Sequence, residues 1–114
     1  MAPTRGEAFG LTIANAMACG MPVIVTKDIN SGHMDYCKGK GVLFIDAWDV
    51  VQGDPDFYME GNMLAEPDLE SLKSQMRWAF ENRDKLKKLG ELNVKEVKHL
   101  TWENTAKKIM SLLS

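Results

Sequence analysis

The chain has 114 residues, of which 45% are hydrophobic and 26% charged, so it can form one small globular domain but not two. Its formal net charge of −2 argues against binding nucleic acid through phosphate neutralisation. No apolar run approaches the roughly 20 residues that a bilayer span requires. The first ten residues, MAPTRGEAFG, lack the apolar core of a signal peptide, and we therefore expect a cytoplasmic protein.

In chain order, the first half of the sequence alternates helix and strand. Residues 11–19 are predicted to form a short helix rich in alanine and methionine, with Gly20 at its C-terminal cap and Pro22 just beyond. Residues 22–26, PVIVT, form a continuous β-branched run that is typical of a strand buried on both faces of a parallel sheet. After a polar loop with a helical turn near 34–38, residues 41–45 predict a second strand of the same kind.

The second half of the chain is predicted to be irregular at first and then helical. Residues 46–67 contain the structure breakers Gly53, Pro55, Gly61 and Pro67. Three amphipathic helices follow, the first starting at Pro67-Asp68 and the third after Thr101 as its N-cap. Their apolar stripes are interpreted as packing surfaces. The stripes consist of Leu69, Leu72, Met76, Ala79 and Phe80; of Leu86, Leu89, Asn93 and Val97; and of Trp102, Ala106, Ile109, Met110 and Leu113.

These elements predict an α/β, Rossmann-like fold in which a partial parallel sheet is flanked by helices. Two short parallel strands cannot bury themselves, because stable sheets have several strands. Either the first segment supplies another strand or something else covers an edge. We therefore interpret residues 1–114 as a single partial domain, the second half of a larger one. Exposed strand edges invite pairing with another chain, so an oligomer is also expected.

The conventional metal ligands are few and scattered. Cys19 and Cys37 form no C-x-x-C pair, and we expect reduced thiols, with Cys19 packed and Cys37 partly exposed. His33 and Cys37 are four residues apart, but two ligands without a third make a poor metal site, so no metal is predicted. His99, near a predicted helix end, is interpreted as structural.

The stretch GEAFGLTIAN joins a glycine-flanked loop to a helix start, where backbone N–H groups and the helix dipole suit a phosphate. Gly10 allows a ligand close to the backbone, Thr12 adds a hydroxyl donor, and Asn15 shares its helical face. Glu7 lies outside the helix and suits the hydroxyls of a sugar. The pattern indicates a nucleotide-sugar. The alternative is a tight surface loop in which Glu7 pairs with Arg5.

The stretch PTRGEAFGLTIANAMACGMPVIVT resembles the C-terminal domain of GT-B-fold, retaining glycosyltransferases of family 4, also described as glycosyl transferases group 1. The family pattern is Pro-Ser/Thr-Arg-x-Glu-x-Phe-Gly-Leu, a second Glu eight positions after the first, and then Glu/Asn-Ala-Met-Ala-Cys-Gly-x-Pro-Val-Ile. The similarity continues through SGHMD, AEPDLESLKSQM and LTWENTAKKI, and so covers nearly the whole chain. It implies that a hexose is transferred from a nucleotide-diphosphate sugar with retention of configuration, and that no metal or other cofactor is needed.

The resemblance also implies roles for individual residues. Glu7 occupies the position of the first Glu, which touches the donor sugar and is implicated in catalysis. Phe9, Gly10, Leu11 and Thr12 occupy the positions whose backbone amides hold the sugar hydroxyls and the pyrophosphate.

Two departures from the family pattern affect these expectations. Asn15 occupies the position of the second Glu, which holds the ribose, and a neutral amide contributes about 0.5–1.5 kcal/mol per hydrogen bond against about 1.5–3 for a charged group. The family's phosphate-binding Arg and Lys lie upstream of the motif, and its acceptor site lies in a separate N-terminal domain. We therefore expect the chain to be inactive alone and to need that region, or another chain, as a partner. The alternative is a non-catalytic α/β module that binds a nucleotide weakly or a protein partner.

Overall fold

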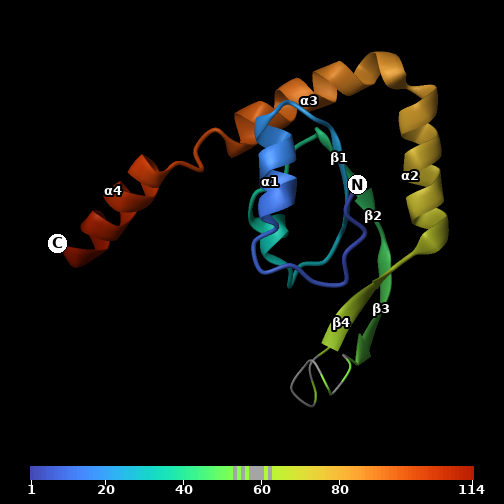
Figure 1. The fold of residues 1–114 in the computed structure, drawn as a ribbon, viewed down its shortest axis with the longest axis horizontal. Helices are drawn as coiled ribbons and strands as arrows, with labels where there is room; N and C mark the ends of the chain where they lie inside the picture. Colours follow the sequence, from blue (N-terminus) through green and yellow to red (C-terminus); the bar gives the residue numbers. More distant parts are fainter. Residues whose placement is uncertain (53, 55, 57–60, 62) are drawn as a thin grey trace.

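The computed structural model describes residues 1–52, 54, 56, 61 and 63–114. It has the predicted α/β architecture, in which β1 and β2 lie beside α1, α3 crosses one end of both, and α2 lies on the far side (Figure 1). The elements are α1 (Leu11–Ala18), β1 (Val23–Thr26), the 3₁₀ helix η1 (Gly32–Asp35), β2 (Val42–Ile45), β3 (Ala47–Gln52), β4 (Met63–Pro67), α2 (Leu69–Glu81), α3 (Arg83–Val97) and α4 (Trp102–Leu113). None of the helices in the described part of the chain is both long and apolar enough to cross a membrane.

The small parallel sheet agrees with the prediction. β1 and β2 pair in parallel, with Val23 opposite Val42 and Thr26 opposite Ile45. On the other edge of β1, the N–H of Ala2 donates to the carbonyl oxygen of Ile24 at 2.8 Å, in a parallel bridge. The first segment therefore supplies the beginning of a third strand, one of the two possibilities that the sequence left open.

The prediction of irregular structure over residues 46–67 is wrong. β3 and β4 form an antiparallel pair, with Gln52 opposite Met63 and Ala47 opposite Pro67, and they project from the rest of the chain (Figure 1). Gly61 precedes β4, and Pro67 is the last residue of β4, which is an edge strand and therefore tolerates proline. The other two breakers, Gly53 and Pro55, lie outside the described residues. In the sequence, these glycines and prolines thus lie between two strands or at the end of one. They do not indicate that all 22 residues lack regular structure.

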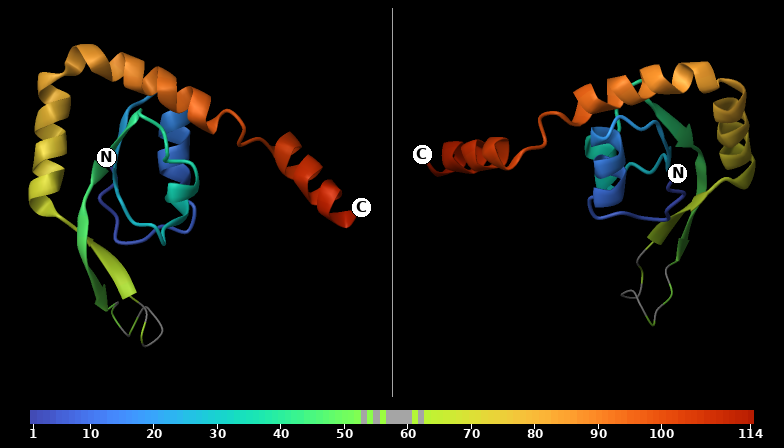
Figure 2. Two further views of the ribbon diagram at one scale, coloured as in Figure 1. Left: turned by 180° about the vertical axis from the view of Figure 1, so that it is seen from behind. Right: turned by 45° about the horizontal axis from the view of Figure 1, so that its top comes forward.

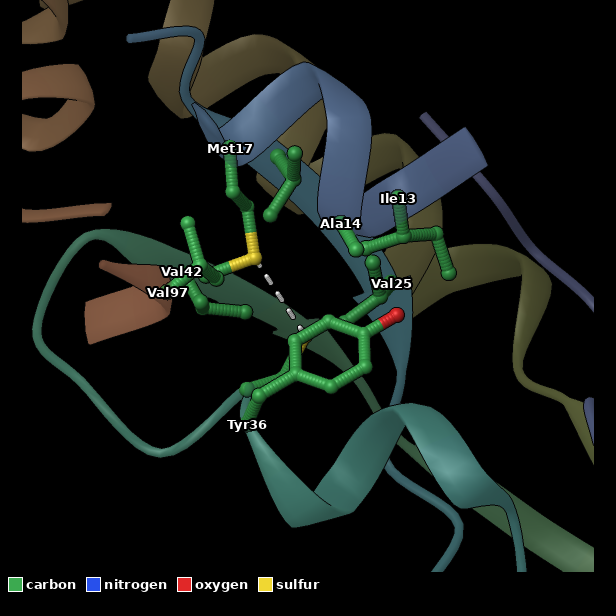
Figure 3. Packing of buried hydrophobic residues seen from close by; sticks show 9 residues of the cluster. Ile13, Ala14, Met17, Val25, Tyr36, Val42 and Val97 are labelled. Carbon is green, nitrogen blue, oxygen red and sulfur yellow. Dashed lines mark hydrogen bonds between the residues drawn. The ribbon is translucent and has the colours of Figure 1, made fainter. Parts of the chain in front are cut away.

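The hydrophobic core lies between α1, β1, β2 and η1. Figure 3 shows the ring of Tyr36 standing beneath α1, close to Met17 and Val25. The thiol of Cys37 donates to the sulfur of Met17 at 3.7 Å. The buried cluster consists of Ile13, Ala14, Met17, Val23, Val25, Tyr36, Cys37, Val42 and Val97.

α3 is held against the end of α1 by a close backbone approach and a buried amide. A Cβ atom on Gly90 would clash with the carbonyl oxygen of Gly20, so the two segments touch without an intervening side chain. The side-chain amide of Asn93 donates to the carbonyl oxygens of Met21 at 2.9 Å and Gly41 at 3.0 Å. Asn93 is thus a buried polar anchor in a stripe that otherwise packs as predicted.

The apolar stripes of the other two long helices are covered only in part, or not at all, within the described part of the chain. Neither α2 nor α4 has a buried residue, and Trp102 is 90% exposed. α4 extends away from the other elements in both views of Figure 2. The prediction of packing is therefore wrong for α4, whose residues are all exposed. For α2 it is confirmed only in part, because Leu72 and Ala79 are half-buried in a helix that contacts β1 and β2, whereas the rest of the stripe is exposed.

Three local predictions also need correction. Cys19 is exposed and Cys37 is buried, the reverse of the expectation, because Cys37 follows η1 into the core beside Met17. The helical turn of the polar loop spans Gly32–Asp35, two residues earlier than predicted. His99 is exposed, although its carbonyl oxygen accepts a hydrogen bond from the side chain of Asn104 at 2.9 Å.

Candidate functional site

α1 begins at a left-handed glycine. Gly10 has φ 76° and ψ 51°, and no side chain caps the helix start. Its carbonyl oxygen accepts from the N–H groups of Ile13 at 2.9 Å and Ala14 at 3.0 Å. The N–H groups of Gly10, Leu11 and Thr12 have no acceptor among the described residues. Successive N–H groups at a left-handed to right-handed junction form a concave anion site, which the helix dipole reinforces.

Only glycine fits at position 10. A Cβ atom there would lie 2.9 Å from the hydroxyl oxygen of Tyr36, 3.1 Å from the Cβ of His33 and 3.2 Å from the Cδ1 of Ile13. The positive φ angle adds a second obstacle, because a side chain strains a left-handed backbone. The helix start is therefore shaped by both local conformation and close packing.

Glu7 is fixed through its backbone, while its carboxylate is left without a partner in the described part of the chain. Its N–H donates to the Oγ of Ser31 at 3.2 Å, and its carbonyl oxygen accepts from the N–H of Gly32 at 2.8 Å. Arg5 pairs with Glu66 at 2.8 Å instead. The alternative interpretation, a surface pair between Glu7 and Arg5, is therefore wrong.

The predicted site residues fall into two groups. Phe9, Leu11 and Asn15 are exposed and line a pocket of about 730 Å³ beside the start of α4. Glu7 and Gly10 do not line that pocket but form the loop that leads into it. The remaining walls of the pocket are Ala14, Ala18, Val97, Leu100, Thr101, Trp102 and Thr105. Thr12, also exposed, lies in the first turn of α1 and outside this lining.

Tyr36 is the part of the site that the sequence analysis missed. Its hydroxyl lies 2.7 Å from the carbonyl oxygen of Phe9 and 2.6 Å from that of Gly10. Its ring packs at an angle of 47° against that of Phe9, with centroids 5.2 Å apart. Burial raises the pKa of Tyr36, so the hydroxyl remains a proton donor. An aromatic residue inside a polar loop was the available signal, since a buried tyrosine hydroxyl needs a partner.

His33 is also buried beside the motif. Its Nε2 lies 2.8 Å from the carbonyl oxygen of Thr26, at the end of β1. His33 therefore helps to join the loop after β1 to the sheet. The described residues contain no group of three or more His, Cys, Asp or Glu side chains that could hold a metal ion.

Comparison with known proteins finds a family that matches most of the chain. The family described as glycosyl transferases group 1 matches residues 1–97. Sucrose synthase 2 of Zea mays is 26% identical over 88 aligned residues, which cover 67% of this chain and 10% of that protein. No solved structure matches the chain.

The chain belongs to the glycosyl transferases group 1 family. The family supports a domain for sugar transfer and does not favour the alternative of a non-catalytic module. The chain corresponds to only about a tenth of the length of the curated relative that it matches. α4 lies beyond the matched residues.

Proposed function

We propose that this chain is the donor-binding part of a GT-B, family 4 glycosyltransferase, which transfers a hexose from a nucleotide-diphosphate sugar with retention of configuration. One observation carries the proposal: the unpartnered N–H groups at the left-handed start of α1 lie in the same loop as the unpaired carboxylate of Glu7. A positive helix start suits a diphosphate, and a nearby carboxylate suits the hydroxyls of the attached sugar. Membership of the group 1 family supports this assignment.

In the proposed mechanism the helix start holds the leaving group. The N–H groups of residues 10–12 and the hydroxyl of Thr12 donate to the diphosphate oxygens, whose negative charge grows as the glycosidic bond breaks. The backbone of Phe9 and Leu11 completes this contact. Hydrogen-bond donors and the helix dipole offset the developing charge, so the proposal needs no metal or other cofactor.

Glu7 and Asn15 hold the two sugars of the donor. The carboxylate of Glu7 accepts from hydroxyls of the transferred hexose and stabilises positive charge at its anomeric carbon. Asn15, one turn into α1 and facing the pocket, binds the ribose. Its neutral amide gives weaker bonds than the glutamate of the family pattern.

The proposal includes partners for the surfaces that this chain does not cover. Transfer requires an acceptor held beside the donor. The family places that acceptor site, and its phosphate-binding cations, upstream of the motif. We therefore expect residues 1–114 to bind a donor without turnover unless that region or another chain is present, and we expect association through an exposed edge of the small sheet. The proposed location is cytoplasmic. Sedimentation as a monomer at every concentration would contradict the association.

Titration calorimetry with UDP-, GDP- and ADP-hexoses tests the function. We expect one nucleotide to bind, and its hexose conjugate to bind more tightly than the free nucleotide. Glu7→Gln should remove the advantage of the conjugate and leave nucleotide binding unchanged. Glu66→Gln, which removes a carboxylate paired with Arg5, is the matched control and should retain the advantage. The proposal fails if no nucleotide-sugar binds even after the upstream region has been supplied in trans.

A further inference from the structure

The loop after β1 grips the nucleotide-sugar motif at successive points along its backbone. Ser31 and Gly32 hold the N–H and the carbonyl of Glu7. A Cβ atom on Gly32 would clash with the carbonyl oxygen of Ala8, so the two loops touch directly. Tyr36, from the same loop, reaches the carbonyl oxygens of Phe9 and Gly10. The shape of the motif therefore depends on residues 24 to 27 positions later in the chain.

The Tyr36 contact controls where the N–H groups of the motif point. A peptide unit is planar and trans, so its carbonyl and its N–H point in opposite directions. The hydroxyl of Tyr36 has one proton, which it shares between the carbonyl oxygens of Phe9 and Gly10, so that both carbonyls face the core. The N–H groups that belong to these two peptide units, those of Gly10 and Leu11, must then face away from the core. These are N–H groups without an acceptor in the described part of the chain.

We propose that Tyr36 is a positioning residue for the donor diphosphate: its hydroxyl, held between two carbonyl oxygens, turns the N–H group of Gly10 outward toward the ligand and, together with the first turn of α1, keeps that of Leu11 in the same direction. The inference rests on the proposed function and deepens it, because it assigns the orientation of the anion site to a side chain outside the motif. Tyr36 touches neither sugar nor phosphate. Its hydroxyl is committed to the backbone, and its ring packs against Phe9 and the core.

A tyrosine that served only for packing would fill the same space as one that positions the backbone. The two roles differ in whether the hydroxyl contributes to nucleotide binding. Tyr36→Phe keeps the ring and its packing but removes the donor. The carbonyl of Gly10 would still accept from Ile13 and Ala14, whereas that of Phe9 has no other donor in the described residues. The first peptide unit of the turn is then free to rotate, and pre-organisation of the anion site is lost.

The test is a titration of the ¹⁵N-labelled chain with UDP, GDP and ADP, followed through the amide resonances of residues 10–12. For the nucleotide that binds, we expect Tyr36→Phe to weaken affinity by roughly 3- to 10-fold, the equivalent of one hydrogen bond. The amide of Gly10 should also exchange with solvent at a different rate in the free protein. Equal affinity and unchanged exchange in Tyr36→Phe would overturn the proposal.

Two controls separate positioning from general stability. Thr26→Val removes a buried hydroxyl that has no hydrogen-bond partner among the described residues, and Ile45→Val removes one methylene from a fully buried side chain of β2. Both should bind the nucleotide as the wild type does. Weakening in Ile45→Val equal to that in Tyr36→Phe would overturn the positioning role. If the wild type binds no nucleotide, the proposed function fails together with this inference, whereas wild-type binding that Tyr36→Phe leaves intact defeats the inference alone.

A second variant covers the case in which Tyr36→Phe does not fold. Placing 3-fluorotyrosine at position 36 retains the ring and strengthens the hydroxyl as a donor. We expect it to move the amide resonances of Gly10 and Leu11 and to change the dissociation constant of the nucleotide. Resonances and affinity that match those of the wild type would overturn the proposal.

Discussion

The hydroxyl of Tyr36 lies 2.6 Å from the carbonyl oxygen of Gly10, although the two residues are 26 positions apart. The contact joins a core side chain to the residue at which α1 begins. Gly10 cannot be exchanged without disturbing it, because a Cβ atom would lie 2.9 Å from the same hydroxyl. Gly10 thus packs against the core, begins α1 and forms part of the proposed anion site.

Gly10→Ala should therefore destabilise the protein on two grounds. A left-handed conformation costs a residue with a side chain roughly 1–2 kcal/mol, and the crowding beside Tyr36 and His33 adds about 1–3 kcal/mol of overpacking. Urea denaturation should show a total loss of about 2–5 kcal/mol in the free energy of unfolding. Nucleotide binding should also weaken, because the turn cannot keep its shape.

Gly61 offers a matched control for this prediction. It has φ 88°, and no atom of the described residues lies within 4 Å of the place where its Cβ would be. Gly61→Ala should incur the conformational cost alone, roughly 1–2 kcal/mol. Equal losses in the free energy of unfolding in Gly10→Ala and Gly61→Ala would show that crowding against Tyr36 does not contribute to the destabilisation.

Gly90→Ala should reverse the usual effect of this substitution in a helix. Alanine in a helix interior is normally better than glycine by about 1 kcal/mol. At position 90 the new Cβ meets the carbonyl oxygen of Gly20, a backbone atom that cannot move aside as a side chain can. Overpacking should cost roughly 1–3 kcal/mol, so after the gain in helix propensity we expect a net loss of up to about 2 kcal/mol, measured by thermal or urea unfolding.

Ser74→Ala on the exposed surface of α2 is the control for Gly90→Ala. It improves helix propensity without adding a contact, so it should leave stability unchanged or raise it by a few tenths of a kcal/mol. A stabilised Gly90→Ala would mean that α3 does not approach Gly20 as closely as the structure shows.

How much of this could be predicted from the sequence depends on the range of the interaction. The helix ending at Gly20 and the strands β1 and β2 were predicted correctly, because a capping glycine and β-branched runs are local signals. The hairpin was missed because its breakers were taken as evidence against strands, whereas they lie between β3 and β4 or at a strand end. The two strands of the hairpin pair across the residues that connect them, and local propensity cannot predict such a pairing.

The candidate site likewise combines local features that were predicted with a long-range contact that was not. The motif from Glu7 to Asn15 was predicted as a site from glycine placement and a helix start. The structure has a left-handed Gly10 at that helix start, and the site itself stays a prediction. The contribution of Tyr36 was not predicted, because a contact over 26 residues leaves no periodic signal. Both α2 and α4 have the apolar face that was predicted, but the face of α4 is uncovered and that of α2 is covered only in part, since periodicity does not identify the partner of a helix.

Stability should fall at alkaline pH, partly through Cys37. Burial, with a smaller contribution from Glu96, raises the pKa of this thiol from 9.0 to about 11. The thiol of the unfolded chain therefore loses its proton at a lower pH than the thiol of the folded chain. Between about pH 9 and 11 this deprotonation favours the unfolded state, so the contribution of Cys37 to stability is complete only below that range. As pH rises through this range, the free energy of unfolding should decrease, by at most about 1.4 kcal/mol for each pH unit.

The two cysteines permit a direct comparison for this prediction. Urea midpoints measured from pH 8 to pH 10 should fall less steeply in Cys37→Ala than in the wild type. Cys19→Ala, which removes an exposed thiol, should retain the wild-type slope. A thiol-specific reagent should modify Cys19 rapidly and Cys37 only after unfolding. Equal slopes in all three proteins would contradict the burial of a neutral Cys37.

Asn15→Glu tests whether this position holds the ribose. A carboxylate there restores the second Glu of the family pattern and replaces neutral hydrogen bonds by charged ones, a gain of roughly 1–1.5 kcal/mol. We expect the nucleotide to bind about 5- to 10-fold more tightly, measured by calorimetry. The gain should disappear with a 2′,3′-dideoxynucleotide, which lacks the hydroxyls that the carboxylate would accept from.

The control for Asn15→Glu must add the same charge at the same pocket without reaching the ribose. Ala18→Glu does so, because Ala18 is exposed, lines the pocket with Asn15 and lies three residues further along α1. A carboxylate near a diphosphate repels it unless hydroxyl donors intervene, so Ala18→Glu should bind the nucleotide equally or more weakly. If both variants strengthen binding alike, or if the dideoxynucleotide shares the gain of Asn15→Glu, position 15 does not contact the ribose.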